Sequence, residues 1–164
     1  MATNLFLQLD SITGGATDEN HQDWIEIFSW SHSFDQPTAP VSKSGGQAAA
    51  TEMCNHAPIS VTKYLDEATY AILSKTWSGK VLPKGKIECF RAGGEDNPIK
   101  YLEVEMEDVV VSNYSISVGE GDMPMENISL SYGKVTYNHI PYKRTGEAKG
   151  NQPVYHDLRS NKVG

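Results

Sequence analysis

Three glutamates, Glu103, Glu105 and Glu107, stand at every second position of one partly apolar stretch. Such alternation places side chains on one face of a β-strand, about 7 Å apart along the chain. A row of carboxylates can bind cations or exchange protons with a substrate, but it is more often solvated or paired with Lys and Arg nearby. Because no neighbouring residue is seen to tune their pKa values, we interpret the three as a solvated face or a subunit interface.

Cys54, Asn55 and His56 bring together a thiol and an imidazole, which is half of a metal site. A zinc centre needs further ligands, and the remaining histidines show no ligand spacing: His21, His32, His139 and His156. Cys89 follows Ile87 in the alternation of a strand, which is typical of ordinary packing. We therefore expect a buried thiol beside a loop histidine, with no metal and no cofactor.

Recognised catalytic motifs do not occur in the sequence. Gly119-Glu120-Gly121 is acidic and is followed by Met123-Pro124, so it does not open a helix as a phosphate-binding loop does. Neither G-x-S-x-G nor H-E-x-x-H is present. We predict that the protein is not an enzyme. A catalytic alternative would need a cleft with perturbed acids around residues 103–107.

Three aromatic residues lie at even positions of a predicted strand and would share one of its faces: Trp24, Phe28 and Trp30. Exposed together, the three rings would form a platform for a sugar. At this spacing they are more typical of a core. A monomeric β-sandwich that binds carbohydrate through these rings is the alternative function that this pattern leaves open.

The composition indicates one acidic globular domain spanning residues 1–164. The chain is 38% hydrophobic and 21% charged, and its net charge of −7 argues against binding to duplex nucleic acid. No apolar run reaches the roughly 18 residues of a membrane span, and the first residues lack the basic start of a Sec signal peptide. The signs of charge are segregated: residues 1–42 carry −6, residues 101–132 carry −7 and residues 133–164 carry +4. Unlike charge on two flanks can steer identical copies together.

Hydrophobic periodicity is mostly two, which predicts strands. One helix is predicted over residues 66–77, with Asp66 as N-cap and Gly79 as the stop. Residues 35–58, rich in Pro and Gly, are predicted to form a long loop, and loops of this length are usually functional or disordered.

Two strands change parity along their length. Apolar residues shift from even to odd positions near Glu107-Asp108, and again across Gly133, which we interpret as β-bulges that help a sheet to curl. The predicted fold is therefore mainly β: a small antiparallel barrel or two-sheet sandwich with one α-helix and a long protruding loop.

The sequence as a whole resembles the haemolysin-coregulated protein (Hcp) family, the tube subunit of type VI secretion. Several spaced motifs in the same order carry the resemblance: Asn4-x-Phe6-Leu7-x-Leu9-Asp10-x-Ile12-x-Gly14, His21-x-x-Trp24-Ile25-x-Ile27-x-Ser29-Trp30-Ser31, Thr62-Lys63-Tyr64-Leu65-Asp66, Ala92-Gly93-Gly94, Tyr101-Leu102, Val109-Val110-Val111-Ser112, Glu126-Asn127-Ile128-x-Leu130 and Tyr137.

This resemblance implies hexameric rings that stack into a hollow tube, held in the bacterial cytoplasm and then secreted without a Sec signal. The implied partners are further copies of the chain, a VgrG-type spike trimer, a contractile sheath and effector proteins. In such proteins a long loop contacts the next ring, so residues 38–57 are the stacking candidate, centred on Ser42, Lys43, Ser44, Gly45, Gly46 and Gln47. We further expect Ser29, Ser31 and Ser33 to line the lumen, because that face turns small and polar in mid-strand.

Overall fold

The structure is a computed structural model that describes residues 4–39, 52–93 and 98–164. Within them the chain forms twelve strands and one helix. In chain order these are β1 (Leu5–Leu9), β2 (Ile25–Glu26), β3 (Ser29–Ser31), β4 (Phe34–Asp35), β5 (Asn55–His56), β6 (Ile59–Tyr64), α1 (Thr69–Ser78), β7 (Leu82–Ala92), β8 (Pro98–Ser117), β9 (Met125–Ser131), β10 (Lys134–His139), β11 (Gln152–Asp157) and β12 (Lys162–Val163).

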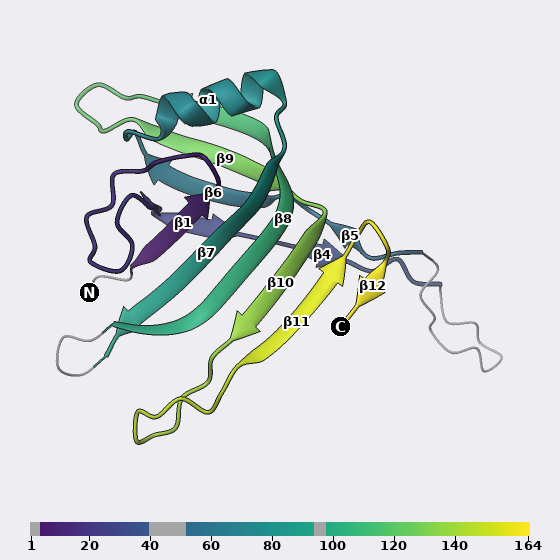
Figure 1. Ribbon diagram of the computed structural model, residues 1–164. Helices are drawn as coiled ribbons and strands as arrows, with labels where there is room; N and C mark the ends of the chain where they lie inside the picture. The colour runs from purple at the N-terminus through teal and green to yellow at the C-terminus, as the bar shows by residue number, and fades with distance from the viewer. Residues whose placement is uncertain (1–3, 40–51, 94–97) are drawn as a thin grey trace.

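Strand β8 belongs to two antiparallel sheets (Figure 1). Along its first half it lies between β7 and β10 in a wide sheet of order β12-β11-β10-β8-β7-β1-β2. Along its second half it pairs with β9, which begins a narrow sheet of order β8-β9-β6-β3. The prediction of a mainly β fold with antiparallel sheets and one helix is confirmed.

The wide and narrow sheets meet at a bend in β8. Asp108 adopts a left-handed backbone conformation, with φ of 54°. As a result Met106 and Val109 are both buried although their parity differs. On the adjacent strand the Gly133 N–H donates to the Glu107 carbonyl at 2.9 Å. The two predicted changes of parity are confirmed, but no bulge lies at either position, because the pairing keeps one register from Glu107 with Lys134 to Val110 with Ser131. The register of β8 with β9 shifts further along, between Val111 and Asn113.

A second crossing between the sheets lies between Ile27 and Phe28. The Ile27 N–H donates to the Leu5 carbonyl in the wide sheet at 3.1 Å, and the Phe28 N–H donates to the Thr62 carbonyl in the narrow sheet at 2.7 Å. The inward parity changes here as well. Ile27 is buried, Phe28 is 61% exposed, and Trp30 again packs against the core.

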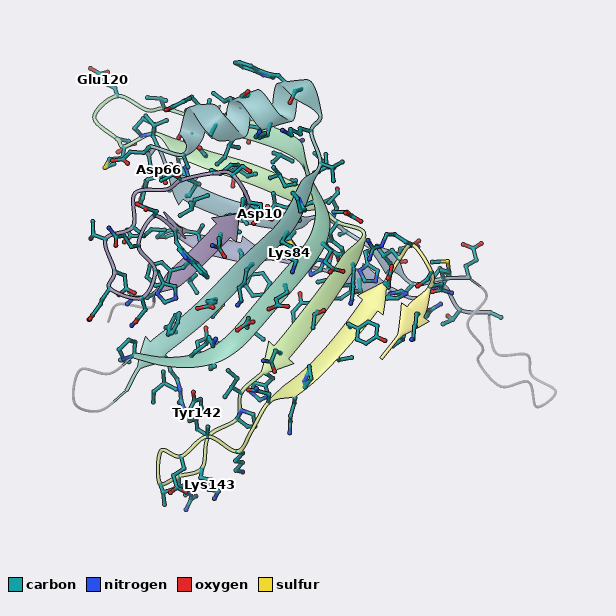
Figure 2. The ribbon with its side chains drawn as sticks, viewed as in Figure 1. Asp10, Asp66, Lys84, Glu120, Tyr142 and Lys143 are labelled. Carbon is teal, nitrogen blue, oxygen red and sulfur yellow. The ribbon has the colours of Figure 1, made fainter. Side chains whose placement is uncertain are left out.

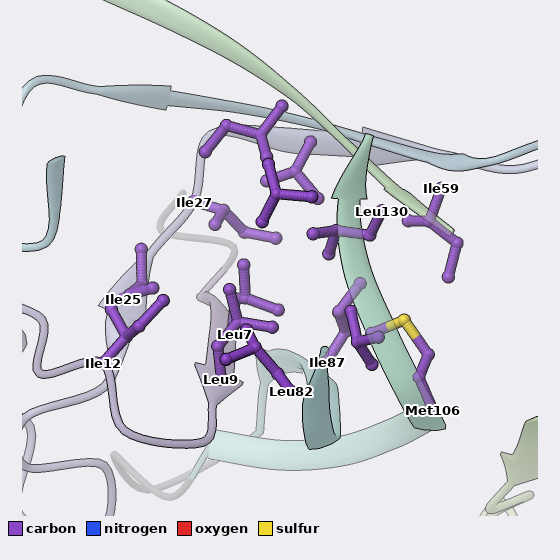
Figure 3. Close-up of a cluster of buried hydrophobic side chains, with 14 of the residues drawn as sticks. Leu7, Leu9, Ile12, Ile25, Ile27, Ile59, Leu82, Ile87, Met106 and Leu130 are labelled. Carbon is purple, nitrogen blue, oxygen red and sulfur yellow. The ribbon is translucent and has the colours of Figure 1, made fainter. Parts of the chain in front are cut away.

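The core lies between the two sheets and is closed by α1 (Figures 1 and 3). Leu7 and Leu9 of β1 are buried in it, as their alternation predicts. Each fully buried Leu or Ile contributes about 1.5–3 kcal/mol of transfer free energy. The other fully buried aliphatic side chains of the core are Ile25, Ile59, Val61, Ile72, Leu82, Ile87, Val104, Met106, Val109, Ile128 and Leu130.

Helix α1 packs on β8 and starts later than predicted. Its N-cap is Ala68, and the Asp66 carboxylate instead accepts a hydrogen bond from the Ala68 N–H at 3.0 Å. Gly79 ends the helix with φ of 62°, as predicted. The buried residues of the helix are Thr69 and Ile72, whereas Tyr70 and Trp77 are exposed.

The predicted long loop is structured at both ends. Strand β4 pairs with β5, with Phe34 opposite His56 and Asp35 opposite Asn55. The prediction of a continuous loop over residues 35–58 is therefore wrong at these ends, because this ladder continues the strand direction of β3. The stacking candidates Ser42, Lys43, Ser44, Gly45, Gly46 and Gln47 lie outside the described residues.

Candidate functional site

The outward face of the narrow sheet carries small polar side chains and no charge. Directly paired residues in an antiparallel sheet point to the same side, so the register defines transverse rows. We call the following set the neutral face: Ser29, Ser31, Ser60, Thr62, Ser112, Asn113, Ser115, Asn127, Ser129 and Ser131. The aliphatic residues that alternate with it on β6 and β9 are buried in the core. The sequence of these strands thus separates an apolar inside from an uncharged outside.

Hydrogen bonds within the neutral face are few and local. Thr62 Oγ1 donates to Asn127 Oδ1 at 2.7 Å, and Ser131 Oγ donates to Ser112 Oγ at 3.1 Å. Of the serines singled out by the sequence, Ser29 and Ser31 are exposed members of this face. The third serine, Ser33, is also exposed, but it lies beyond β3 and outside the ladder of the narrow sheet.

The outward face of the wide sheet is charged. Glu103, Glu105 and Glu107 lie on one side of β8, as predicted, because the residues between them are buried. The register places each glutamate opposite a charged residue of β7: Glu88, Lys86 and Lys84 respectively. We call the following set the charged face: Lys84, Lys86, Glu88, Lys100, Glu103, Glu105, Glu107, Lys134 and Arg159.

All three predicted interface glutamates form ion pairs within the chain. Glu103 lies 2.7 Å from Lys100 Nζ and 3.2 Å from Lys86 Nζ. Glu107 lies 3.3 Å from an Arg159 guanidinium nitrogen. Glu105 is the most exposed, with 54% of its side chain accessible, and is 3.6 Å from Lys86 Nζ.

The charged face also tunes two carboxyl groups. Burial opposes ionisation of Glu103, but hydrogen bonds from Lys100 and Lys86 outweigh it and lower the pKa of this group. The hydrogen bond with Glu103 raises the pKa of Glu105, and burial adds to the effect. The expectation that nothing nearby tunes these acids is therefore wrong, because β7 and the start of β8 supply lysines that the linear sequence does not place beside them.

The three aromatic rings considered for sugar binding do not share a face. Trp30 packs on the core and its indole N–H donates to the buried Cys89 Sγ at 3.3 Å. Phe28 is exposed and meets Tyr64 edge to face, away from Trp30 and Cys89. Trp24 lies at the far end, against the ring of His21. The prediction of a core position is right for Trp30 and wrong for Phe28, and no common platform results.

The thiol and imidazole pair of Cys54 and His56 gathers no further ligands. Among the described residues, no group of three or more His, Cys, Asp or Glu side chains is arranged to hold a metal ion. Cys54 is partly exposed and Cys89 is buried, and both are free thiols. Burial raises the pKa of Cys89, which agrees with its interpretation as a packing residue.

Comparison with known proteins gives consistent matches over the whole chain. Residues 6–139 match the family model described as "Type VI secretion system effector, Hcp". Protein hcp1 of Pseudomonas aeruginosa is 31% identical over 164 residues, which cover 98% of each chain. This chain belongs to the Hcp family.

Solved structures agree with the family in fold. One, described as the structure of a type six secretion system protein, has 27% identity and a TM-score of 0.87, with 99% of this chain and 100% of that chain covered. Hcp1 of Salmonella typhimurium has 25% identity and a TM-score of 0.76, with both chains fully covered. No helix of the described part of this Hcp chain is long and apolar enough to cross a membrane.

Two motifs of the family meet at a buried ion pair. Lys63 Nζ lies 3.1 Å from Glu126 Oε2, and both side chains are fully buried. Lys63 Nζ also lies 2.8 Å from Asp66 Oδ1, and Glu126 Oε1 accepts from Thr69 Oγ1 at 2.5 Å. Figure 2 shows Asp66 beside the start of α1. The pair thus fixes the beginning of the helix to the narrow sheet of this Hcp protein.

A third motif of the Hcp family is anchored by His21. Its Nδ1 is 2.6 Å from an Asp18 carboxylate oxygen, and its Nε2 is 2.7 Å from a Glu88 oxygen. The ring stacks on Phe6 with centroids 4.3 Å apart. The hydrogen bond to His21 lowers the pKa of Asp18. These contacts fasten the long connection between β1 and β2 to β7.

Sequence reasoning missed both anchors, although one signal was available. Lys63 continues the buried parity of Ile59 and Val61, and Glu126 precedes the buried parity of Ile128 and Leu130. A charged residue at an inward position must be paired to be tolerated there. When two inward positions on different strands carry opposite charges, the sequence predicts that the two residues pair.

Proposed function

We propose that this Hcp protein is the tube subunit of a type VI secretion system, with about six copies closing into a ring and rings stacking into a hollow tube. Head-to-tail contacts close when their rotation divides a full turn, and ring-on-ring contacts leave an open filament. Membership of the family and the match of the whole chain to a type six secretion system protein support this proposal.

The neutral face carries the proposal, because it suits the wall of a channel. The chain is 21% charged with net charge −7, yet the ten residues of the neutral face, which span four strands, are all Ser, Thr or Asn. The residues that the register adds at its ends, among them Tyr64, Met125 and Val110, are also uncharged. Charged walls, repeated around a ring, would focus a strong field in a narrow lumen and would hold or repel cargo. Short uncharged side chains hydrate the wall while leaving its potential close to zero. Ser29 and Ser31 belong to this lumen surface, and Ser33 stands at its border.

Unlike ends of the subunit support head-to-tail association. Figure 2 shows Glu120, in the turn between β8 and β9, and Lys143, in the turn between β10 and β11, at opposite ends of the molecule. Such complementarity steers copies into one orientation. Among the predicted interface glutamates, Glu105 is the most available to a neighbouring subunit, because its side chain is the most exposed and its contact with Lys86 is longer than the ion pairs of Glu103 and Glu107.

Assembly into a tube also assigns the contacts between rings and the partners of the tube. Residues 38–57, with Ser42, Lys43, Ser44, Gly45, Gly46 and Gln47 at their centre, contact the next ring. The tube assembles in the cytoplasm within a contractile sheath, receives a spike trimer, and is exported with effectors held in its lumen. The protein performs this work by assembly, without catalysis.

Substitution on the neutral face tests the lumen assignment. Ser31→Gln extends a side chain into the channel in every copy, so we expect lower retention and abundance of lumen-borne effectors in cells. Ser78→Gln, at the exposed end of α1, is the matched control and should leave both unchanged. If effector retention and abundance are the same in Ser31→Gln and in the wild type, Ser31 does not face the lumen.

A further inference from the structure

Five hydrogen bonds form an unbroken chain of imidazole and phenol groups beside β4 and β5. His32 bonds to the Tyr137 hydroxyl through Nδ1 at 2.5 Å and to the Tyr132 hydroxyl through Nε2 at 2.6 Å. Tyr132 also bonds to His56 Nδ1 at 2.7 Å. His56 Nε2 lies 2.8 Å from His156 Nδ1, and His156 Nε2 lies 3.0 Å from Asn161 Oδ1.

This chain of hydrogen bonds connects separate parts of the fold. His56 belongs to β5, and His32 lies between β3 and β4. The other members come from the turn between β9 and β10, from β10 and β11, and from the turn before β12. The chain therefore fastens the β4–β5 pair to the wide sheet. Strand β4 precedes residues 38–57, the segment that the resemblance assigns to ring stacking, and β5 lies near the end of that segment.

The hydrogen-bond chain has one hydrogen available for each of its five contacts. Asn161 Oδ1 can only accept, so His156 Nε2 donates and its Nδ1 accepts from His56 Nε2. Continuing in the same sense, Tyr132 donates to His56 Nδ1 and accepts from His32 Nε2, and Tyr137 donates to His32 Nδ1. Three neutral histidines and two tyrosines thus supply one hydrogen to each of the five contacts.

Additional protons are unfavourable in this arrangement. His32 can accept one if the Tyr137 hydroxyl turns its hydrogen away, because His32 Nδ1 then donates to the Tyr137 oxygen, but this leaves a positive charge at a buried position without a counter-ion. A second proton, on His56 or His156, would hold two like charges close together. Unless the Tyr132 hydroxyl also turned its hydrogen away, it would in addition put hydrogens on both sides of one contact.

The surroundings favour the neutral form. Burial lowers the pKa of His32 to about 4, and burial followed by the charge of His156 lowers the pKa of His56. Burial also raises the pKa of Tyr137 to about 12, so this hydroxyl keeps its proton. The titratable groups facing the histidines are Glu52 and Cys54 before β5, Tyr132 and Tyr137 from β9–β10, and Tyr155 from β11. Among the described residues no carboxylate forms an ion pair with any of the three histidines.

We propose that this histidine–tyrosine chain is a proton-sensitive latch that holds the β4–β5 pair against the wide sheet while its histidines are neutral, and releases it in mild acid. The inference rests on the geometry of one subunit and does not require that the subunit form a tube. If the subunit does, acid loosens the attachment of the segment assigned to ring stacking.

Hydrogen exchange measured at single residues on the full-length protein tests the latch. The Ala57 N–H donates to the Ser33 carbonyl at 3.1 Å, so its protection reports the attachment of β4–β5. Between pH 7.5 and pH 5, after correction for intrinsic exchange, we expect its opening to increase about thirty-fold from the shift of His32 alone, with a pKa of about 4 when latched and about 6.5 when released. Amides of the β6–β9 ladder should not respond.

Variants and a titration separate the latch from general acid sensitivity. The triple variant His32→Gln, His56→Gln, His156→Gln removes every titrating histidine of the chain, so the protection of Ala57 should become independent of pH. His139→Gln, which is exposed and outside the chain, should behave as the wild type. Should the triple variant fail to fold, NMR titration of wild-type histidines decides the matter. Independent titration of His32 and His56 near 6.5, or equal protection of Ala57 at both pH values, would overturn the proposal.

Discussion

The two halves of β8 present opposite surfaces. Before the bend at Asp108 its outward side carries Glu103, Glu105 and Glu107, and beyond the bend it carries polar residues without charge. Inside the molecule the order is reversed. The narrow sheet hides the ion pair of Lys63 and Glu126 beneath its neutral face, whereas the inward side of the wide sheet is aliphatic. The narrow sheet therefore keeps its charged pair on the inward side and leaves its outward side uncharged.

Breaking the hidden pair should have the largest effect on stability. Lys63→Met leaves the Glu126 carboxylate buried without a counter-ion, which costs about 3–5 kcal/mol. Chemical denaturation measures this loss. The double variant Lys63→Met, Glu126→Gln should recover part of it, because no uncompensated charge remains. A loss below about 1 kcal/mol in the single variant would mean that the pair is not buried as described.

Removing the hydrogen bonds of His21, on the charged side of the wide sheet, should have the second largest effect on the free energy of unfolding. His21→Phe keeps the stack on Phe6 but removes the contacts to Asp18 and Glu88. Because hydrogen bonds to charged groups are worth about 1.5–3 kcal/mol, we expect a loss of about 2–3 kcal/mol in the free energy of unfolding. Phe6→Leu, which keeps both hydrogen bonds, is the comparison. An equal loss in the two variants would assign the stability to packing alone.

The decline in the free energy of unfolding at acid pH should depend on Glu103. Its pKa is lower in the folded protein than in the unfolded chain, so its contribution is complete above about pH 4.5 and is lost as the pH falls through the folded pKa. Glu103→Gln should cost about 1 kcal/mol at pH 7 and should show a shallower decline between pH 5 and pH 3. Urea midpoints at a series of pH values measure both. A decline as steep as that of the wild type would contradict the assignment.

The smallest effect is expected for Glu105, whose pKa shift has the opposite sign. Because ionisation of Glu105 is less favourable in the folded state, Glu105→Gln should leave stability at pH 7 within about 0.5 kcal/mol of the wild type or raise it slightly. The same urea midpoints measure this. A loss above 1 kcal/mol would show that the pair with Lys86 stabilises the charged face more than its exposure suggests.

Sequence periodicity predicted the framework of the fold because strands bury alternate residues. It predicted the antiparallel β fold, the single helix with its stop at Gly79, and both changes of parity along β8 and β9–β10, but not strand β6. It also failed between Ile27 and Trp30, because the chain there leaves one sheet for another and the inward positions change parity. Only the pairing of both segments with other strands reveals such a crossing.

Polar contacts over long distances were beyond the reach of the sequence. Asp66 has the type and position of a helix cap, yet its carboxylate is drawn to Lys63 and the helix begins later. The hydrogen-bond chain from His32 to Asn161 joins residues from six places in the fold, and their sequence spacing resembles neither a ligand set nor a helix cap. The neutral face could be anticipated only in part, from Ser29, Ser31 and Ser33, because its other members come from strands whose register was not known.

Electron microscopy of labelled rings tests the central claim that copies assemble around the neutral face. In a Cys54→Ser background, Ser31→Cys and Ser78→Cys would each carry the same bulky maleimide label. We expect rings of about six copies of 18.1 kDa, with extra density in the central hole for the label on residue 31 and outside it for the label on residue 78. Single particles without rings, or rings whose hole stays empty when residue 31 is labelled, would contradict it.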